Sequence, residues 1–242
     1  MAETGHAKNV EHLAAMIEFV KGYGATYNPT NGDLSLAKLQ TLLTQANTDV
    51  GNVSTIMSSY KVAVNDRENV FTGIRQLATR VVNAFAVSGA AENAIEDAKG
   101  FKRKLDGARA KALPKDDPGT PVDESKGGSV SQQSYTQLVQ HLDDLIHLLT
   151  TDGHYNPNET PLKLVTLNAL STTLKTKNQA VLTATAPLSN ARVARDTTLY
   201  GSPNGLCDRA SLVKKYVKSL YGADSPQYKQ ISGLEFTRPG KK

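Results

Sequence analysis

The sequence contains a single cysteine, Cys207, and no tryptophan among its 242 residues. One cysteine excludes an internal disulfide and any zinc site built from several cysteines. Cys207 lies in an apolar row with Leu206 and Ala210, so we expect a buried, inert thiol and not a nucleophile. Aromatic residues make up 6% and hydrophobic residues 39% of the chain, which suits slender helical cores better than one thick globular core.

Long apolar runs are missing as well. No stretch approaches the roughly 18 apolar residues that a membrane-spanning helix needs, and residues 1–6 lack the basic and apolar regions of a secretory signal. We therefore expect a cytoplasmic protein without a membrane span, with export by an unrecognised route left open. A glycine-rich phosphate loop, a Gly-x-Ser-x-Gly elbow and a Cys–His pairing are also absent, so nothing indicates an enzyme or a cofactor.

What the sequence does contain is an internal repeat. Residues 27–67 match residues 155–195 at 13 of 41 positions, at a constant offset of 128, whereas composition alone gives roughly 2–3 matches. Each copy opens with Tyr-Asn-Pro, followed by a ladder of leucines. A repeat of this length predicts one helical unit that is present twice.

The Tyr-Asn-Pro segment predicts a stiff turn. Proline fixes its own φ and holds the preceding asparagine in an extended conformation. We expect the ring of Tyr27 to pack over the helix ends while its hydroxyl stays in water. The tyrosine and proline of both copies are therefore predicted to be structural or interface residues: Tyr27, Pro29, Tyr155 and Pro157.

Apolar residues at helical spacing predict an all-α fold. In the first copy they indicate four helices: 9–23, from Asp33 as the N-cap to about 64, 66–88 and 90–105. The second of these carries a heptad-like seam that needs a partner helix along its whole length. In the second copy polar residues interrupt this seam at Ser171, Asn178 and Thr185.

The second copy shows the same order of elements. A helix is expected over 131–149, and Thr160-Pro161 predicts the start of a long helix that Pro187 should end or kink. The segment 201–205 interrupts the pattern, Gly222 ends the next helix, and Ser225-Pro226 predicts a brief last one.

These elements predict two tandem antiparallel helical bundles, that is, two pseudo-repeats of three to four helices each. The first repeat covers 1–105, and the second covers 131–242 with a basic C-terminal tail. Between them, residues 106–130 form a Pro/Gly-rich linker. This linker is either a flexible tether or an ordered arm that reaches a neighbouring subunit.

Three sequence segments together resemble a group of uncharacterised bacterial all-helical proteins. These are Tyr-Asn-Pro-Asn with its leucine ladder, Val-Lys-Lys-Tyr-Val-Lys-Ser-Leu-Tyr-Gly, and the tail Ser-Pro-Gln-Tyr-Lys-Gln-Ile-Ser-Gly-Leu-Glu-Phe-Thr. The resemblance covers most of 135–237 and, more faintly, 9–101. It implies a helical fold, and it carries over no activity, cofactor or site residue.

The candidate metal ligands are His141, Asp144 and His147, whose spacing of three places them near one face of a helix. Imidazole and carboxylate groups suit zinc or iron. The first copy offers Leu13, Met16 and Phe19 at the matching offset, so a symmetric di-iron arrangement is not expected. A polar or interfacial helix face is the favoured interpretation.

Two sets of basic residues remain. Arg67 and Arg195 occupy equivalent positions in the two copies and either bind an anion or, as we favour, pair with carboxylates and carbonyls beside the bundle core. Lys214, Lys215 and Lys218 form a basic helix face that could meet phosphates. The net charge of +5 is only a weak indication of such a partner.

The repeat, the long seam and the lack of catalytic motifs favour a non-catalytic structural protein that self-associates, for example into a filament or another regular assembly. The alternative is a binding module that holds nucleic acid or an anionic partner through the basic second repeat. A metal-dependent enzyme that uses the two histidines is a third interpretation, and we disfavour it.

Overall fold

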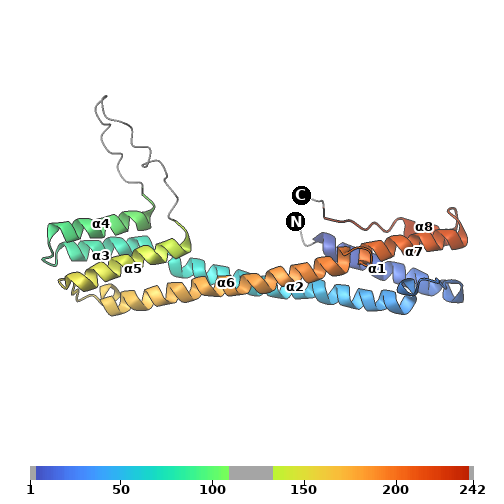
Figure 1. The fold of residues 1–242 in the computed structure, drawn as a ribbon, viewed down its shortest axis with the longest axis horizontal. Helices are drawn as coiled ribbons and strands as arrows, with labels where there is room; N and C mark the ends of the chain where they lie inside the picture. Colours follow the sequence, from blue (N-terminus) through green and yellow to red (C-terminus); the bar gives the residue numbers. More distant parts are fainter. Residues whose placement is uncertain (1–3, 109–132, 240–242) are drawn as a thin grey trace, which may run out of the picture. The chain divides into compact units, whose positions relative to one another are not determined.

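The computed structural model describes residues 4–108 and 133–239, and all the regular elements in these ranges are helical (Figure 1). The all-α class predicted from the sequence is therefore confirmed. Most of the predicted linker 106–130 lies outside the described residues. The α-helices are α1 (Thr4–Gly22), α2 (Leu36–Phe71), α3 (Ile74–Ala86), α4 (Glu92–Asp106), α5 (Tyr135–Asp152), α6 (Leu164–Tyr200), α7 (Leu206–Tyr221) and α8 (Pro226–Ser232). Short 3₁₀ turns precede the two long helices: η1 (Gly24–Thr26), η2 (Gly32–Leu34) and η4 (Thr160–Leu162).

The chain forms two compact units that differ from the predicted repeats 1–105 and 131–242. The terminal unit consists of Met1–Lys61 and Ala184–Lys242, and the central unit consists of Val62–Thr183. Each unit thus takes one part of α2 and one part of α6. Helix lengths explain the difference. The 36 residues of α2 span about 54 Å and the 19 residues of α1 only about 28 Å, so α1 is too short to accompany α2 over more than about half of its length.

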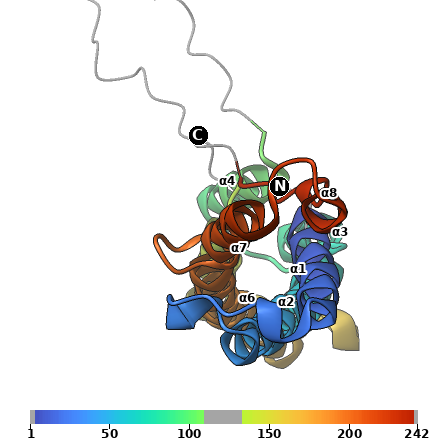
Figure 2. The ribbon, with the colours of Figure 1, turned by 90° about the vertical axis from the view of Figure 1, so that its right-hand side faces the viewer.

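In the terminal unit, α1, α7 and α8 pack against one another, as the end view in Figure 2 shows. The first part of α2 and the last part of α6 complete this unit. Within it, Val53 of α2 clusters with Leu188 and Ala191 of α6, so part of the predicted seam finds its partner helix there. The main core consists of Val10, Leu13, Met16, Ile17, Val20, Leu34, Leu39, Ala46, Leu199, Leu206, Cys207, Ala210, Val213, Val217 and Ile231.

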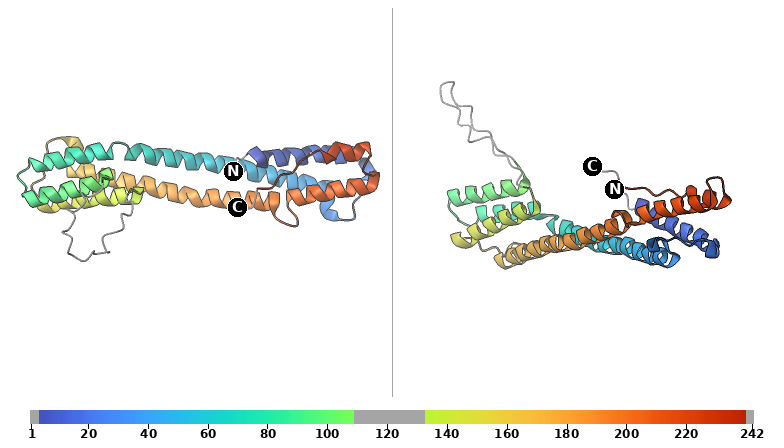
Figure 3. Two further views of the ribbon diagram at one scale, coloured as in Figure 1. Left: turned by 90° about the horizontal axis from the view of Figure 1, so that it is seen from above. Right: turned by 45° about the vertical axis from the view of Figure 1, so that its right-hand side comes forward.

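In the central unit, α4 packs against both α3 and α5, and Figure 3 shows these three helices side by side. The last part of α2 and the first part of α6 complete this unit. Its core is larger and includes the aromatic residues Phe71, Phe85 and Tyr155. The fully buried side chains include Val81, Phe85, Ala98, Leu105, Leu145, Leu149 and Leu174.

Several predicted helix boundaries differ from the structure. Thr160 and Pro161 begin the 3₁₀ turn η4, and α6 itself starts at Leu164. α3 begins at Ile74 and not near 66, because α2 continues to Phe71 and Gly73 then takes a left-handed φ of 86°, which favours glycine. Asp33 does not cap α2: the side chain of Asn31 accepts a hydrogen bond from the Asp33 N–H at 3.0 Å to start η2.

Of the two outcomes predicted at Pro187, an end of the helix or a kink, the end is not found, because α6 continues to Tyr200. A proline inside a helix removes one backbone hydrogen bond and costs about 3 kcal/mol. Val181 and Leu188 are buried on either side of it, and this packing offsets the cost. The cap at Ser225 is confirmed, since its hydroxyl accepts from the Tyr228 N–H at 3.1 Å and Pro226 opens α8.

Candidate functional site

Both Tyr-Asn-Pro turns are closed by the same hydrogen bond. The Tyr27 hydroxyl donates to the carbonyl of Leu34 at 2.7 Å, and the Tyr155 hydroxyl donates to the carbonyl of Leu162 at 2.9 Å. Burial raises the pKa of both phenols, that of Tyr155 to about 12, so both remain neutral donors at ordinary pH. The Tyr27 hydroxyl, predicted to stay in water, donates to a main-chain carbonyl of its own turn.

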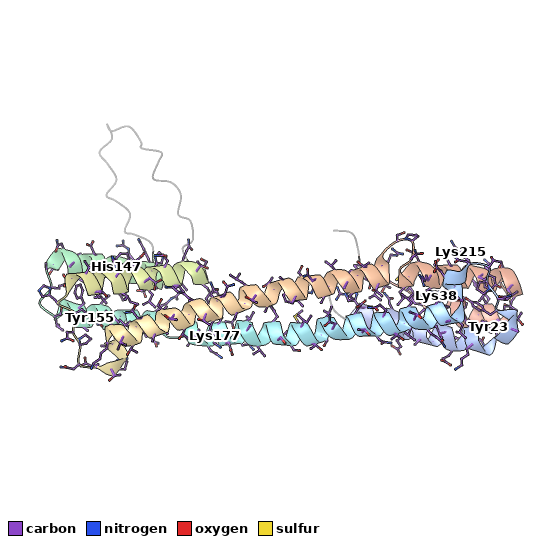
Figure 4. The ribbon with its side chains drawn as sticks, turned by 60° about the horizontal axis from the view of Figure 1, so that its bottom comes forward. Tyr23, Lys38, His147, Tyr155, Lys177 and Lys215 are labelled. Carbon is purple, nitrogen blue, oxygen red and sulfur yellow. The ribbon has the colours of Figure 1, made fainter. Side chains whose placement is uncertain are left out.

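Each of these tyrosines also contacts an aromatic residue that is distant in the sequence. The Tyr27 ring meets Tyr216 of α7 edge-on at 5.3 Å between centroids, and the Tyr155 ring meets Phe85 of α3 at 6.1 Å. Figure 4 labels Tyr155 in the central unit. Pro29 and Pro157 are half-buried beside them. The two turns thus join elements that are far apart in sequence.

Arg67 and Arg195 both lie within helix packing. The Arg67 guanidinium stacks on the Tyr135 ring at 4.0 Å and donates to the Asn178 side-chain oxygen at 3.4 Å. Arg195 is 5% exposed and pairs with the adjacent Asp196 carboxylate at 2.8 Å. Arg195 thus pairs with a carboxylate, as favoured from the sequence, whereas Arg67 contacts an aromatic ring and a side-chain amide.

The three candidate metal ligands are not brought together. His141 is buried, whereas His147 is exposed (labelled in Figure 4), and Asp144 accepts a hydrogen bond from Gln140 at 2.8 Å. Asp144 and His147 line an open groove of about 740 Å³ between α4 and α5, together with Phe101 and Lys104. Within residues 4–108 and 133–239, no group of three His, Cys, Asp or Glu side chains is placed to hold a metal ion.

His141 is unusual because both of its ring nitrogens are buried and neither has a hydrogen-bond partner among the described residues. Burial lowers the pKa of His141, the positive charge of Lys104 on α4 lowers it further, and Asp144 partly opposes this. The imidazole is therefore held in its neutral form inside the central unit.

The predicted basic face of α7 is only partly available to a ligand. Lys214 is half-buried and donates to the carbonyls of Ser232 and Leu234 at 3.0 and 2.6 Å. Burial lowers the pKa of its ammonium group, and Glu235 opposes this. Lys215 and Lys218 are exposed, and Lys218 lies 5.7 Å from the Tyr228 ring. The Lys214 side chain thus binds the chain's own backbone.

That backbone belongs to the segment after α8, which we call the C-terminal segment (residues 233–239). It forms no helix and lies against α1 and α7. Asn9 of α1 binds it like a paired strand: its Nδ2 donates to the Thr237 carbonyl at 2.7 Å, and its Oδ1 accepts from the Thr237 N–H at 3.0 Å. Asn9 is 1% exposed, so these bonds satisfy an amide that burial would otherwise penalise.

Two further side chains hold the same segment. The ring nitrogen Nδ1 of His12 donates to the Glu235 carbonyl at 2.6 Å, and Lys214 approaches from the other helix. We call Asn9, His12 and Lys214 the clamp. The Phe236 ring packs edge-on against the His12 ring at 6.0 Å between centroids, which adds an apolar contact to the main-chain bonds.

The end of the segment is held by Arg238, which donates to the Tyr200 carbonyl at 3.3 Å and forms an ion pair with Asp208. The Tyr200 hydroxyl in turn lies 2.8 Å from the buried His6 ring and accepts from Asn9 at 3.3 Å. This polar network was not predicted from the sequence. The available signal was Asn9 itself, a polar residue within the apolar stripe of the first helix, but its partners lie up to 228 residues away.

Cys207 lies under this network and is 6% exposed. Burial raises the pKa of its thiol to about 11, while Arg238 lowers it and Asp208 raises it slightly. A neutral, buried thiol is a poor nucleophile. The inert role expected from the sequence therefore agrees with its surroundings.

None of the helices in the described ranges combines the length and the apolar character that crossing a bilayer requires. The side chains that stand out in both units bind other parts of the same chain, chiefly through main-chain carbonyls and aromatic rings. Comparisons with protein-family models, with curated proteins and with solved structures find no match.

Proposed function

We propose that this chain is a non-catalytic structural protein that self-associates through the surfaces of its helical bundles into a regular assembly such as a filament. We further propose that it arose by duplication of one helical unit, so that residues 1–105 and 131–242 are pseudo-repeats. The matching Tyr-Asn-Pro turns support the duplication, because the same side chain closes the same carbonyl in both.

The observation that carries this proposal is how the repeats share the two units. The terminal unit takes α1 and the first part of α2 from the first repeat, but the last part of α6, α7 and α8 from the second. The central unit has the reverse composition, with α5 and the first part of α6 from the second repeat. Neither repeat contains all the helices of a unit, so each needs the other to bury its apolar faces.

Such mutual dependence favours association between chains. The first repeat of one chain can complete a unit with the second repeat of another chain, in the manner of domain swapping. Because the two repeats of a chain can then engage two different neighbours, the contact is heterologous and need not close, which produces open polymers.

Light scattering after size exclusion at several concentrations, followed by electron microscopy, tests this proposal. We expect masses that rise with concentration and a regular assembly in the images. A strictly monomeric species of 26.0 kDa at every concentration would contradict it.

An internal cross-link supplies the matched variant. Asp66 of α2 and Lys177 of α6 form an ion pair at 2.6 Å within the central unit, and Lys177 is labelled in Figure 4. Asp66→Cys with Lys177→Cys, in a chain that also carries Cys207→Ala and is treated in dilute solution with a short bismaleimide linker that spans the length of the lost ion pair, joins the two repeats of one chain and should suppress assembly. The single variant Asp66→Cys under the same conditions is the control and should assemble normally.

The alternative function, a module that holds nucleic acid or another anionic partner, is supported by the exposed Lys215 and Lys218. It is weakened because Lys214 binds main-chain carbonyls. Retention on heparin that falls steeply with salt would favour it. Passage through heparin at low salt, together with concentration-dependent assembly, would favour the structural role.

A further inference from the structure

We propose that the groove between α1 and α7 is a binding site for extended main chain, and that the C-terminal segment of a second copy of this chain occupies it. This inference rests on the proposed self-association and names one contact through which it occurs. In the structure the same groove holds the chain's own segment, which shows the chemistry of a fitting occupant.

The groove recognises backbone more than side chains. The clamp binds the carbonyls of Leu234 (through Lys214), Glu235 (through His12) and Thr237 (through Asn9), and Asn9 also binds the Thr237 N–H. Donors from two helices thus reach the segment from α1 and from α7. Main-chain hydrogen bonds of this kind hold extended peptides in many recognition sites.

Apolar and charged contacts add specificity. Leu234 and Phe236 are half-buried against the terminal core, and the ring of Phe236 lies 5.6 Å from the Lys214 ammonium. At the far end Arg238 pairs with Asp208 of α7. An occupant therefore needs an apolar residue, a large aromatic residue two positions later and an arginine after a further two, which is the pattern of this segment.

The segment can leave without dismantling the unit. None of its described residues is fully buried, whereas Leu13, Met16, Val213 and Val217 beneath it are at most 2% exposed and belong to α1 and α7. The segment also follows the last helix, α8, so it can leave the groove without any helix having to move out of the unit. A groove that accepts this segment from its own chain accepts the identical segment from another.

Concentration decides which copy occupies the groove. A short tether gives the chain's own segment an effective concentration on the order of millimolar. Neighbouring copies in an assembly reach similar local concentrations, so exchange is expected there and is rare between dilute monomers. The groove and the segment would thereby join successive copies.

A cross-linking experiment on the full chain tests this inference. One chain carries Ser211→Cys, because Ser211 is exposed on α7 and lines a hollow with Phe236 and Arg238. A second chain, with a longer tag, carries Thr237→Cys in the segment. Cys207→Ala in both removes the native thiol. The two are mixed at increasing concentration and treated with a short bismaleimide linker.

We expect a covalent hybrid of the two chains whose yield rises with concentration. The control replaces Ser211→Cys by Ser219→Cys, the same substitution on the same helix about 12 Å further along, and should give a several-fold lower yield. A single chain with both Ser211→Cys and Thr237→Cys reports whether the groove forms, since it should cross-link internally.

A hybrid yield no greater than in the Ser219→Cys control, with efficient internal cross-linking of the double variant, overturns the inference. Failure of the double variant to cross-link internally overturns it as well, because the groove would then not hold the segment. If light scattering detects assemblies but no hybrid forms, self-association occurs through another surface and the groove inference is overturned. If the hybrid forms although light scattering gives only the monomeric mass, exchange of the segment in the groove is supported and the proposed regular assembly is contradicted.

Discussion

Helix α1 of the terminal unit and helix α5 of the central unit bury the same pattern of positions but offer different side chains. Asn9, Leu13, Met16 and Val20 are buried in α1, and Leu138, Leu142, Leu145 and Leu149 are buried in α5, each 129 residues further on. In this register Asn9 corresponds to Leu138, and His12 corresponds to His141. Two helices with the same buried face therefore meet different neighbours.

The neighbours explain the difference. In the central unit α5 packs against α4, a helix of 15 residues, whereas α8 in the terminal unit has only 7 residues and is followed by the extended C-terminal segment. A helix uses its carbonyls internally, so Leu138 fits beside it and His141 finds no acceptor. An extended segment leaves its carbonyls unpaired, so Asn9 and His12 are needed to satisfy them.

The comparison shows that the place of a residue in the buried stripe of a helix does not by itself decide whether a polar or an apolar side chain is stable there. The main-chain groups of the neighbouring element decide which side chain is stable there. Polar residues in the first repeat thus mark the element that α1 packs against, and this can be tested by exchanging residues between the units.

The largest effect is expected for Leu138→Asn in the central unit. The substitution removes buried apolar volume and introduces an amide where no extended backbone is available to bind it. We expect a loss of about 3–5 kcal/mol in the free energy of unfolding, measured by urea denaturation.

Val165→Asn is the matched control, because Val165 is 73% exposed on α6 in the same unit. Valine and asparagine have similar helix propensities, so a change within about 0.5 kcal/mol is expected. Equal losses of unfolding free energy for Leu138→Asn and Val165→Asn would show that the Leu138 side chain makes no stabilising apolar contact in the central unit.

The reciprocal change, Asn9→Leu, should release the C-terminal segment. It removes both hydrogen bonds to Thr237, each worth about 1 kcal/mol. The Thr237 amide should then exchange its proton at least about tenfold faster, since tenfold corresponds to about 1.4 kcal/mol. Lys8→Leu, at the exposed neighbouring position of α1, should leave the exchange rate unchanged. Retained protection in Asn9→Leu would mean that other contacts hold the segment.

The helices themselves were largely predictable, because their signals are local. Ser225-Pro226, Gly222 and the apolar stripes of α1 and α5 fix elements through neighbouring residues. Whether Pro187 ends α6 or lies inside it could not be decided from the sequence, because the packing of Val181 and Leu188 outweighs a local preference. Tertiary contacts decide such cases, and spacing along the chain does not report them.

The pairing of elements was less predictable still. The repeat suggested that each copy folds on itself, whereas the units combine parts of both copies. The apolar seam from Leu36 to Val64 predicts a partner helix, but its spacing does not indicate whether that partner is a helix nearby in sequence or the distant α6. The clamp was missed for the same reason, since Asn9 and Thr237 show no shared pattern in the sequence.

The unpartnered His141 predicts a pH dependence of the central unit. Its pKa is lowered in the folded state, while in the unfolded chain it has the ordinary value of about 6.5. The unfolded state therefore takes up the proton first, and stability falls as the pH drops below about 6.5, with a slope of at most about 1.4 kcal/mol per pH unit. His141→Leu should remove this contribution, measured by thermal unfolding between pH 5 and pH 8.

His147→Gln controls for the loss of a histidine, because His147 is exposed on the same helix. The difference in unfolding free energy between His141→Leu and the native chain should grow toward low pH, in favour of the variant. A difference that is constant with pH would mean that the pKa of His141 is the same in the folded and the unfolded chain.

The smallest effects concern the two Tyr-Asn-Pro turns, where the same hydrogen bond lies in different surroundings. Tyr155 is 4% exposed and Tyr27 is only half-buried. Tyr155→Phe leaves the carbonyl of Leu162 without water or protein donor and should cost about 1.5 kcal/mol, whereas water replaces the lost donor in Tyr27→Phe, which should cost about 0.5 kcal/mol.

Tyr60→Phe is the control for these two variants. The Tyr60 ring is half-buried on α2, and its hydroxyl has no hydrogen-bond partner within the described part of the chain, so the substitution should be close to neutral. Urea denaturation of the three variants ranks them. A larger loss for Tyr27→Phe than for Tyr155→Phe would mean that the turn of the terminal unit, where Tyr27 also meets Tyr216, depends more on its hydroxyl than its exposure indicates.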